Sequence, residues 1–148
     1  MQARKMPGHL IRRMNQISSQ VFAMRMQGAG HDLTPVQFAA LDAIVAEPGI
    51  DQAGVAARIA YDRATIGGVI DRLEQKGFVS RTVSRKDRRA REVNATAAGQ
   101  AAFIAILPTV IDLQSDIVRG LSESEQAQFL ALAQKIIDQN SKENEAAD

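Results

Sequence analysis

The side chains in this sequence that are best suited to binding chemistry are basic and gather in one part of the chain. Residues 58–91 hold ten Lys or Arg against four acids, whereas residues 92–148 hold three against nine. The overall net charge of +1 therefore hides a polarised molecule. Positive charge concentrated in one segment favours a surface that binds phosphate groups over a charge pattern that serves solubility alone. The main candidates for contacts with a nucleic acid are Arg63, Arg72, Arg85, Lys86, Arg88 and Arg89.

The rest of the composition argues against several other kinds of protein. The chain has no cysteine and only two histidines, and it shows no nucleophile triad, phosphate-binding glycine loop or cluster of metal ligands. We therefore expect no enzyme, no cofactor and no metal. The absence of cysteine is compatible with a reducing cytoplasm, and we expect no membrane span because no run of about 18 apolar residues is present. Aromatic residues make up only 4%, which disfavours a surface that stacks single-stranded bases.

A helix is predicted from Asp62 to Gly77, with Asp62 as its N-cap and Gly77 at its end. Its apolar positions fall on one face, at Ile66, Val69, Ile70 and Leu73. The first turn would carry Arg63, Ala64 and Thr65. From there, arginine can donate two hydrogen bonds to guanine, and threonine can form a hydrogen bond with a base or contact a thymine methyl group. The alternative for Arg63 is a solvated surface charge.

Two adjacent glycines, Gly67 and Gly68, lie within this predicted helix. Each lowers helix stability by about 1 kcal/mol relative to alanine, so a compensating role is expected. One interpretation is a close approach of the helix backbone to DNA, which would make both glycines part of the DNA-binding site. The other is drift at a position that faces solvent.

A short hairpin is predicted directly after the helix. Residues 78–83 and 92–94 read as strands, and the highly charged loop of residues 84–91 connects them. Arginines at a loop tip are attracted by the negative potential of a narrow minor groove. We therefore expect this loop to contact DNA through Arg85, Lys86, Arg88 and Arg89, although an ordinary charged hairpin would show the same residues.

The remaining chain predicts helices on both sides of this module. Thr34 should cap a helix that begins with Pro35, and Asp51 should cap a short helix ahead of Asp62, giving a helix-turn-helix. The expected fold is mainly α with a small β-hairpin. We expect an N-terminal dimerisation helix in 1–30, a winged helix-turn-helix lobe in 31–95, C-terminal dimerisation helices in 96–140 and a disordered tail in 141–148, with a kink at Pro108. The outer helices carry more apolar surface than one lobe can hide, so we expect a two-fold dimer.

Together these features resemble the MarR family of winged-helix transcription regulators over almost the whole chain. The residues that carry the resemblance are Leu33-Thr-Pro-Val-Gln-Phe-Ala-Ala-Leu41, Arg63-Ala-Thr-Ile66, Ile70-Asp-Arg-Leu-Glu-Gln-Lys-Gly-Phe-Val-Ser-Arg81 and Asp87-Arg-Arg89. The resemblance implies a homodimer that binds an operator in double-stranded DNA and releases it on binding a small aromatic carboxylate or phenol. It also implies that Asp87 pairs with an arginine, Arg72 or Arg89, and shapes the wing.

By the same resemblance, a ligand pocket would lie between the first and second helices. Arg13 and His9 are the first candidates to hold a ligand carboxylate there, and Arg12 and Phe38 are further ones. The stretch from Asp62 to Glu74 is similar to MarR-type repressors of nicotinate degradation, which implies a hydroxylated nicotinate as inducer. The alternative function is a winged-helix module that binds DNA constitutively, or binds protein, without an inducer.

Overall fold

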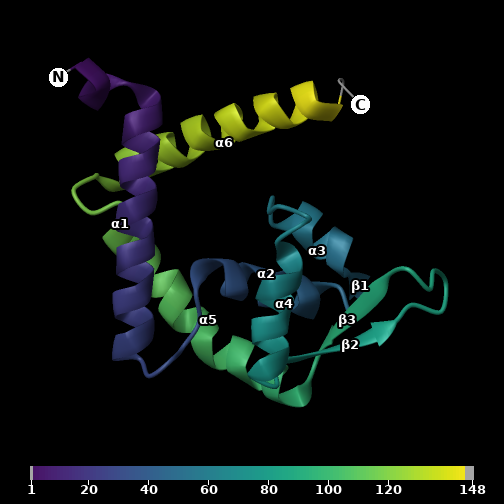
Figure 1. Cartoon of the computed structure of the whole chain (residues 1–148). Helices are drawn as coiled ribbons and strands as arrows, with labels where there is room; N and C mark the ends of the chain where they lie inside the picture. The colour runs from purple at the N-terminus through teal and green to yellow at the C-terminus, as the bar shows by residue number, and fades with distance from the viewer. Residues whose placement is uncertain (1, 146–148) are drawn as a thin grey trace. The chain divides into compact units, whose positions relative to one another are not determined.

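A computed structural model describes residues 2–145 of the chain, which are mainly helical with one small sheet (Figure 1). The elements in chain order are a 3-10 helix η1 (Gln2–Lys5), α1 (Pro7–Gly28), α2 (Pro35–Ala46), β1 (Ile50–Asp51), α3 (Gln52–Arg58), α4 (Ile66–Gln75), β2 (Val79–Val83), β3 (Arg91–Ala95), α5 (Ala97–Ile117) and α6 (Glu123–Glu145). The expected fold class, a helical protein with a winged helix-turn-helix, is confirmed.

The chain divides into two compact units, Met1–Leu113 and Gln114–Asp148. The first unit therefore joins α1, the winged lobe and most of α5, where the sequence predicted separate domains with boundaries at 30 and 95. Aromatic contacts explain the joining: the ring of Phe38 lies 6.4 Å from that of Phe22 on α1 and stacks at 5.6 Å on that of Phe103 on α5. An ion pair between Arg25 and Asp112 adds a second link between α1 and α5.

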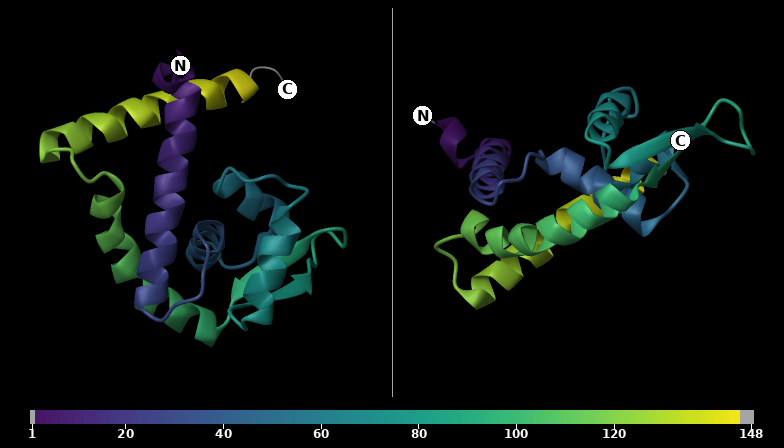
Figure 2. Two further views of the ribbon diagram at one scale, coloured as in Figure 1. Left: turned by 60° about the vertical axis from the view of Figure 1, so that its left-hand side comes forward. Right: turned by 90° about the horizontal axis from the view of Figure 1, so that it is seen from below.

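The sheet has three antiparallel strands in the order β1-β3-β2. Strands β2 and β3 pair from Val79 opposite Ala95 to Val83 opposite Arg91, which confirms the predicted hairpin. The sequence did not predict β1, because two residues directly after Pro48-Gly49 are too short to show an alternating pattern. The hairpin loop extends away from the helices of its unit in all the views of Figures 1 and 2.

The predicted caps of α2 and α3 are present in the winged lobe. Thr34 and Gln37 form both hydrogen bonds of a capping box at the start of α2. The Asp51 carboxylate accepts a hydrogen bond of 2.6 Å from the backbone N–H of Gly54 and caps α3. At α5, Thr96 accepts a bond from the Gly99 N–H and donates one to the Gly77 carbonyl, so the helix start is tied to the turn before the wing.

The core of the winged lobe forms where three helices meet the sheet. Its fully buried side chains include Leu41 and Ile44 of α2, Val55 of α3, Ile66, Ile70 and Leu73 of α4, and Val93 of β3. The predicted inner face of α4 is therefore confirmed, with Val69 also buried. This packing fixes α4 on one side and leaves its other side exposed.

Helix α5 bears on the expectation that the chain has no membrane span. It contains Pro108 and is the one helix in residues 2–145 that is long and apolar enough, by length and composition, to cross a membrane. The helix has no uninterrupted apolar run of that length, because polar residues interrupt it. Its mean hydropathy is nevertheless high, because a mean averages over those polar residues. A core helix of a folded protein passes the same test; in α5, Ile106 and Leu113 are buried, but only 22% of its most apolar 18-residue stretch is buried within the described chain.

Both units leave apolar side chains exposed. In the first unit these include Leu10, Ile11, Met14 and Ile17 on α1 and Ile104 and Ile111 on α5, and in the second Leu130, Leu132, Ile136 and Ile137 on α6. Helix α6 continues to Glu145, so residues 141–145 of the predicted tail are helical. The rest of that predicted tail, residues 146–148, lies outside the described residues.

Candidate nucleic-acid interface

The start of α4 differs from the prediction. The regular helix begins at Ile66 with Thr65 as its N-cap, and Asp62 caps the preceding turn instead. The Asp62 carboxylate accepts a hydrogen bond from the N–H of Ala64, while its carbonyl accepts bonds from the N–H groups of Thr65 and Ile66. An Asx turn of this kind offers the backbone an alternative to the helix, and Gly67 and Gly68 favour helix weakly. Arg63 and Ala64 therefore lie in an exposed turn ahead of the helix.

The exposed side of α4 carries little side-chain bulk near the start of the helix. Thr65, Gly68 and Arg72 are all exposed and share a face by their spacing of three and four residues. A Cβ added at Gly68 would meet no atom within 4 Å, and one at Gly67 would meet only the Gln52 side chain, at 3.8 Å. Nothing within the chain therefore requires either glycine. Their place in the first turn of α4, not its middle, also makes them less costly than the sequence suggested.

The wing loop is shaped by two short side chains. Ser84, which is buried, donates a hydrogen bond to Glu92 and accepts bonds from the backbone N–H groups of Lys86 and Asp87. Asp87 in turn accepts a bond of 2.9 Å from the backbone N–H of Arg89. The expected pairing of Asp87 with the guanidinium of Arg72 or Arg89 is not found among the described residues. An exposed loop gains more from closing a tight backbone turn than from a screened ion pair.

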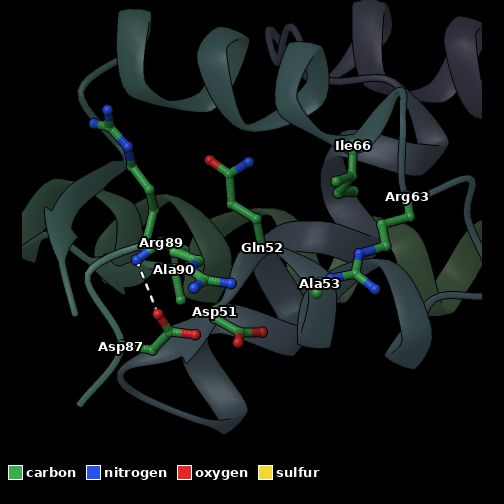
Figure 3. A pocket seen from close by; sticks show the side chains of 9 residues that line it. Asp51, Gln52, Ala53, Arg63, Ile66, Asp87, Arg89 and Ala90 are labelled. Carbon is green, nitrogen blue, oxygen red and sulfur yellow. Dashed lines mark hydrogen bonds between the residues drawn. The ribbon is translucent and has the colours of Figure 1, made fainter.

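An open cleft of about 430 Å³ is lined by residues at the start of α3, in the turn before α4 and on the wing, and Figure 3 shows these residues. Arg63, Arg89 and Arg91 line it, together with the carboxylates of Asp51 and Asp87. The structure thus brings Arg63 and Arg89 to one place, although 25 positions separate them in the sequence. Lys86 instead lines a neighbouring cleft of about 420 Å³, and the exposed Arg85 and Arg88 line neither of the two.

Arg81, to which the sequence assigned no role, bonds three side chains through its guanidinium. Its Nε bonds to Glu74 at 2.7 Å, one terminal nitrogen lies 2.6 Å from Asp71, and the other donates to Gln52 at 3.1 Å. The hydrogen bond that Arg81 donates to Glu74, helped by Asp71, raises the pKa of Arg81 above its ordinary value. The available signal in the sequence was its position on a strand, seven and ten residues after Glu74 and Asp71, but only the fold shows that it bonds these acids.

The predicted ligand-binding residues do not come together within one chain. His9, Arg12 and Arg13 lie on the first two turns of α1, where Arg12 and Arg13 are exposed and Arg13 bonds to Gln16. Phe38 instead contacts Phe22, which lies nine residues after Arg13 on α1. At 1.5 Å per residue, that separation is about 14 Å along the helix. The chain therefore does not close a pocket around both the cations and the aromatic ring.

The described residues show no sign of a metal centre. In residues 2–145, no group of three or more His, Cys, Asp or Glu side chains gathers in a way that could hold a metal ion.

Comparison with known proteins agrees with this arrangement. The pattern of the MarR family matches residues 31–90. The transcriptional regulator HosA of Escherichia coli is 32% identical over 72% of this chain and 78% of its own length. The HTH-type transcriptional repressor NicR of Pseudomonas putida is 30% identical over 88% of this chain and 82% of its own.

Among solved structures, the chain is similar to BpsR of Bordetella bronchiseptica, whose DNA binding is regulated by 6-hydroxynicotinic acid. The two are 27% identical, the match covers 91% of this chain and 95% of that one, and the TM-score is 0.83. These relatives are regulators of transcription and not enzymes. With its winged lobe, its basic cleft and these relatives, the chain belongs to the MarR family of transcription regulators.

Proposed function

We propose that this protein is a cytoplasmic, homodimeric repressor that binds a palindromic DNA operator and releases it on binding a small aromatic carboxylate. The observation that carries the proposal is the joint placement of Arg63, ahead of α4, and Arg89, on the wing, around one open basic cleft. Two cationic side chains from different elements, both exposed, can engage one duplex at two points.

The DNA-binding mode follows from which groups are fixed and which are free. Helix α4 is held by its buried face, so its exposed side, with Thr65, Gly68 and Arg72, can enter the major groove. Arg63 and Ala64 would reach base edges from the turn at its start. The basic side chains of the wing would contact phosphates and the minor groove; they are Arg85, Lys86, Arg88 and Arg89. Asp87 would hold the loop in shape through its hydrogen bond with the Arg89 backbone.

A second copy of the chain would cover the exposed apolar side chains. Leu10, Ile11 and Met14 on α1 are between 40% and 55% exposed, and Ile136 and Ile137 on α6 are 60% and 57% exposed. Groups of exposed apolar side chains on each unit, taken separately, indicate an interface. A two-fold dimer would set two α4 helices roughly 34 Å apart, one turn of DNA, which matches a palindromic operator.

A hydroxylated nicotinate is the inducer that we favour. The DNA binding of BpsR, a solved structure to which this chain is similar, is regulated by 6-hydroxynicotinic acid. On this chain, Arg13 and His9, with Arg12 nearby, offer basic side chains for the ligand carboxylate, whereas Phe38 of the same chain packs on Phe22, too far along α1 to contact the same ligand. The guanidinium of Arg13 is exposed and bonds only a neutral amide, Gln16, so a carboxylate can displace that bond.

The test is binding to the promoter DNA that flanks the protein's own gene, at near-physiological salt, with and without a panel of aromatic carboxylates. We expect tight specific binding that 6-hydroxynicotinate relieves and that nicotinate, which lacks the hydroxyl group, relieves less. The variant Arg13→Gln should keep DNA affinity but lose the response to the ligand. Tight binding that no compound relieves would favour the alternative, a constitutive DNA-binding module, and absence of specific binding would contradict the proposal.

A further inference from the structure

Arg81 joins three elements of the winged lobe through one guanidinium group. It lies at the middle of β2, opposite Val93 of β3, and each of its three nitrogens has a partner. These partners are Glu74 and Asp71 on α4 and Gln52 at the first residue of α3. In residues 2–145, its bonds are the only side-chain hydrogen bonds or ion pairs between β2 and α4.

The surroundings of Arg81 separate it from the other basic residues of the region. Its side chain is 21% exposed, and two carboxylates more than balance its charge. Arginine suits such a site because its planar fork can bond two carboxylates and an amide at once, which a lysine ammonium cannot do in the same geometry. Arg81 is therefore poorly placed to neutralise a DNA phosphate.

We propose that Arg81 is a positioning residue, which sets the wing at a fixed angle to α4 so that both can contact one DNA duplex. The inference rests on the proposed DNA-binding function but concerns a residue that does not itself touch DNA. Hairpins pair internally through backbone bonds, and these bonds hold β2 to β3 but do not orient the pair against α4. The buried Val79 and Val93 hold the sheet in the core of the lobe, and the guanidinium adds polar bonds that fix the hairpin against α4, since it bonds side chains one turn apart there, Asp71 and Glu74.

The position of the wing can be measured without DNA. The chain has no cysteine, so spin labels can be placed singly on the exposed ends of the two elements through Val83→Cys and Gln75→Cys. We expect a narrow distance distribution in the labelled parent and a clearly broader one after Arg81→Met. Arg58→Met is the matched control, because Arg58 is also ion-paired, with Glu47, but does not bond α4. An unchanged distribution after Arg81→Met would overturn the proposal.

A second variant keeps the test decisive if Arg81→Met does not fold. Glu74→Gln keeps the size of the side chain but removes the charge that Arg81 bonds, and we expect it to broaden the same distribution. If Glu74→Gln folds and leaves the distribution narrow, the positioning role is refuted.

The consequence for DNA binding is measured by a double-mutant cycle with Arg88→Ala, a change in the exposed wing loop. If Arg81 acts through the wing, Arg81→Met should weaken operator binding by about tenfold. The Arg88→Ala change should then add little, because its contact is already lost. If the losses of operator affinity caused by the two single changes multiplied in the double variant, Arg81 would not act through the wing. If the wild type bound no DNA, the proposed function would fail, while the spin-label distances would still decide the role of Arg81.

Discussion

Replacing Gly68 by alanine should change folding stability and DNA binding in opposite directions. Gly68 is the third residue of α4, is exposed, and has a backbone conformation that any residue can adopt. An added methyl group would meet no atom of the chain within 4 Å. Alanine should therefore be accommodated without any shift in the surrounding structure.

The size of the stability effect follows from this position. Glycine to alanine at a compatible site stabilises a protein by about 0.4–1 kcal/mol, largely by restricting the unfolded chain. For a site in the first turn of a helix, the expected gain in folding stability lies at the lower end of this range, at about 0.5 kcal/mol. It corresponds to a rise of about 1–2 °C in Tm for a chain of this size. Urea denaturation at fixed protein concentration measures the change.

The effect on DNA binding tests whether the glycine serves the interface. If the backbone of α4 approaches the duplex closely at Gly68, the methyl group should weaken operator binding by about fivefold, or about 1 kcal/mol. Fluorescence anisotropy with labelled operator gives the affinity, and Gly28→Ala in α1 is the matched control, because its added methyl group also meets no atom. Higher stability with unchanged operator affinity would refute the close approach and leave the glycine as drift at a solvent-facing position.

Three further changes test other parts of the structure. Gly99→Ala should destabilise the fold by about 2–3 kcal/mol in urea denaturation, because its Cβ would lie 1.9 Å from the Phe78 carbonyl oxygen and backbone must move; a loss below about 0.5 kcal/mol would contradict that packing. Arg88→Ala should weaken binding to all DNA sequences alike and lower the salt slope of log K by about 1; an unchanged slope would remove this side chain from the interface. The Lys76 ammonium lowers the pKa of Asp32 through a hydrogen bond and its charge, so the pair stabilises the fold above the ordinary pKa of 3.8 and loses its effect as pH falls through the lowered value. Asp32→Asn should therefore be less stable than the wild type at pH 7 but equal to it in acid, and a difference that persists well below pH 3.8 would assign it to another cause.

Local signals in the sequence were sufficient for most of the fold. The caps at Thr34 and Asp51 and the inner face of α4 depend on neighbours within a few residues, so propensity and spacing reveal them. The start of α4 was misplaced, because an Asx turn at Asp62 has the same sequence signature as a helix N-cap. The two-residue β1 was missed because it is formed by its pairing with Val93 of β3 and Glu92 beside it, which sequence spacing does not show.

The candidate interface was predicted by composition but not by geometry. The cluster of basic residues in the sequence indicated Arg63 and the wing as candidates for DNA contacts. Only the fold shows that Arg63 and Arg89 line the same cleft. Long-range partners were beyond the sequence for the same reason. Arg81 read as an ordinary strand residue and proved to bond two helices, while Asp87 was expected to pair with a guanidinium and bonds the backbone of Arg89 instead.

The central claim is that the turn ahead of α4 reads DNA sequence, and Arg63→Ala tests it most directly. The measurement is affinity for the operator and for random DNA of equal length at the same salt concentration, for the wild type and the variant. We expect the free energy of operator binding to fall by about 1–3 kcal/mol while non-specific binding changes little. Equal losses on both DNAs, or no loss on either, would contradict it.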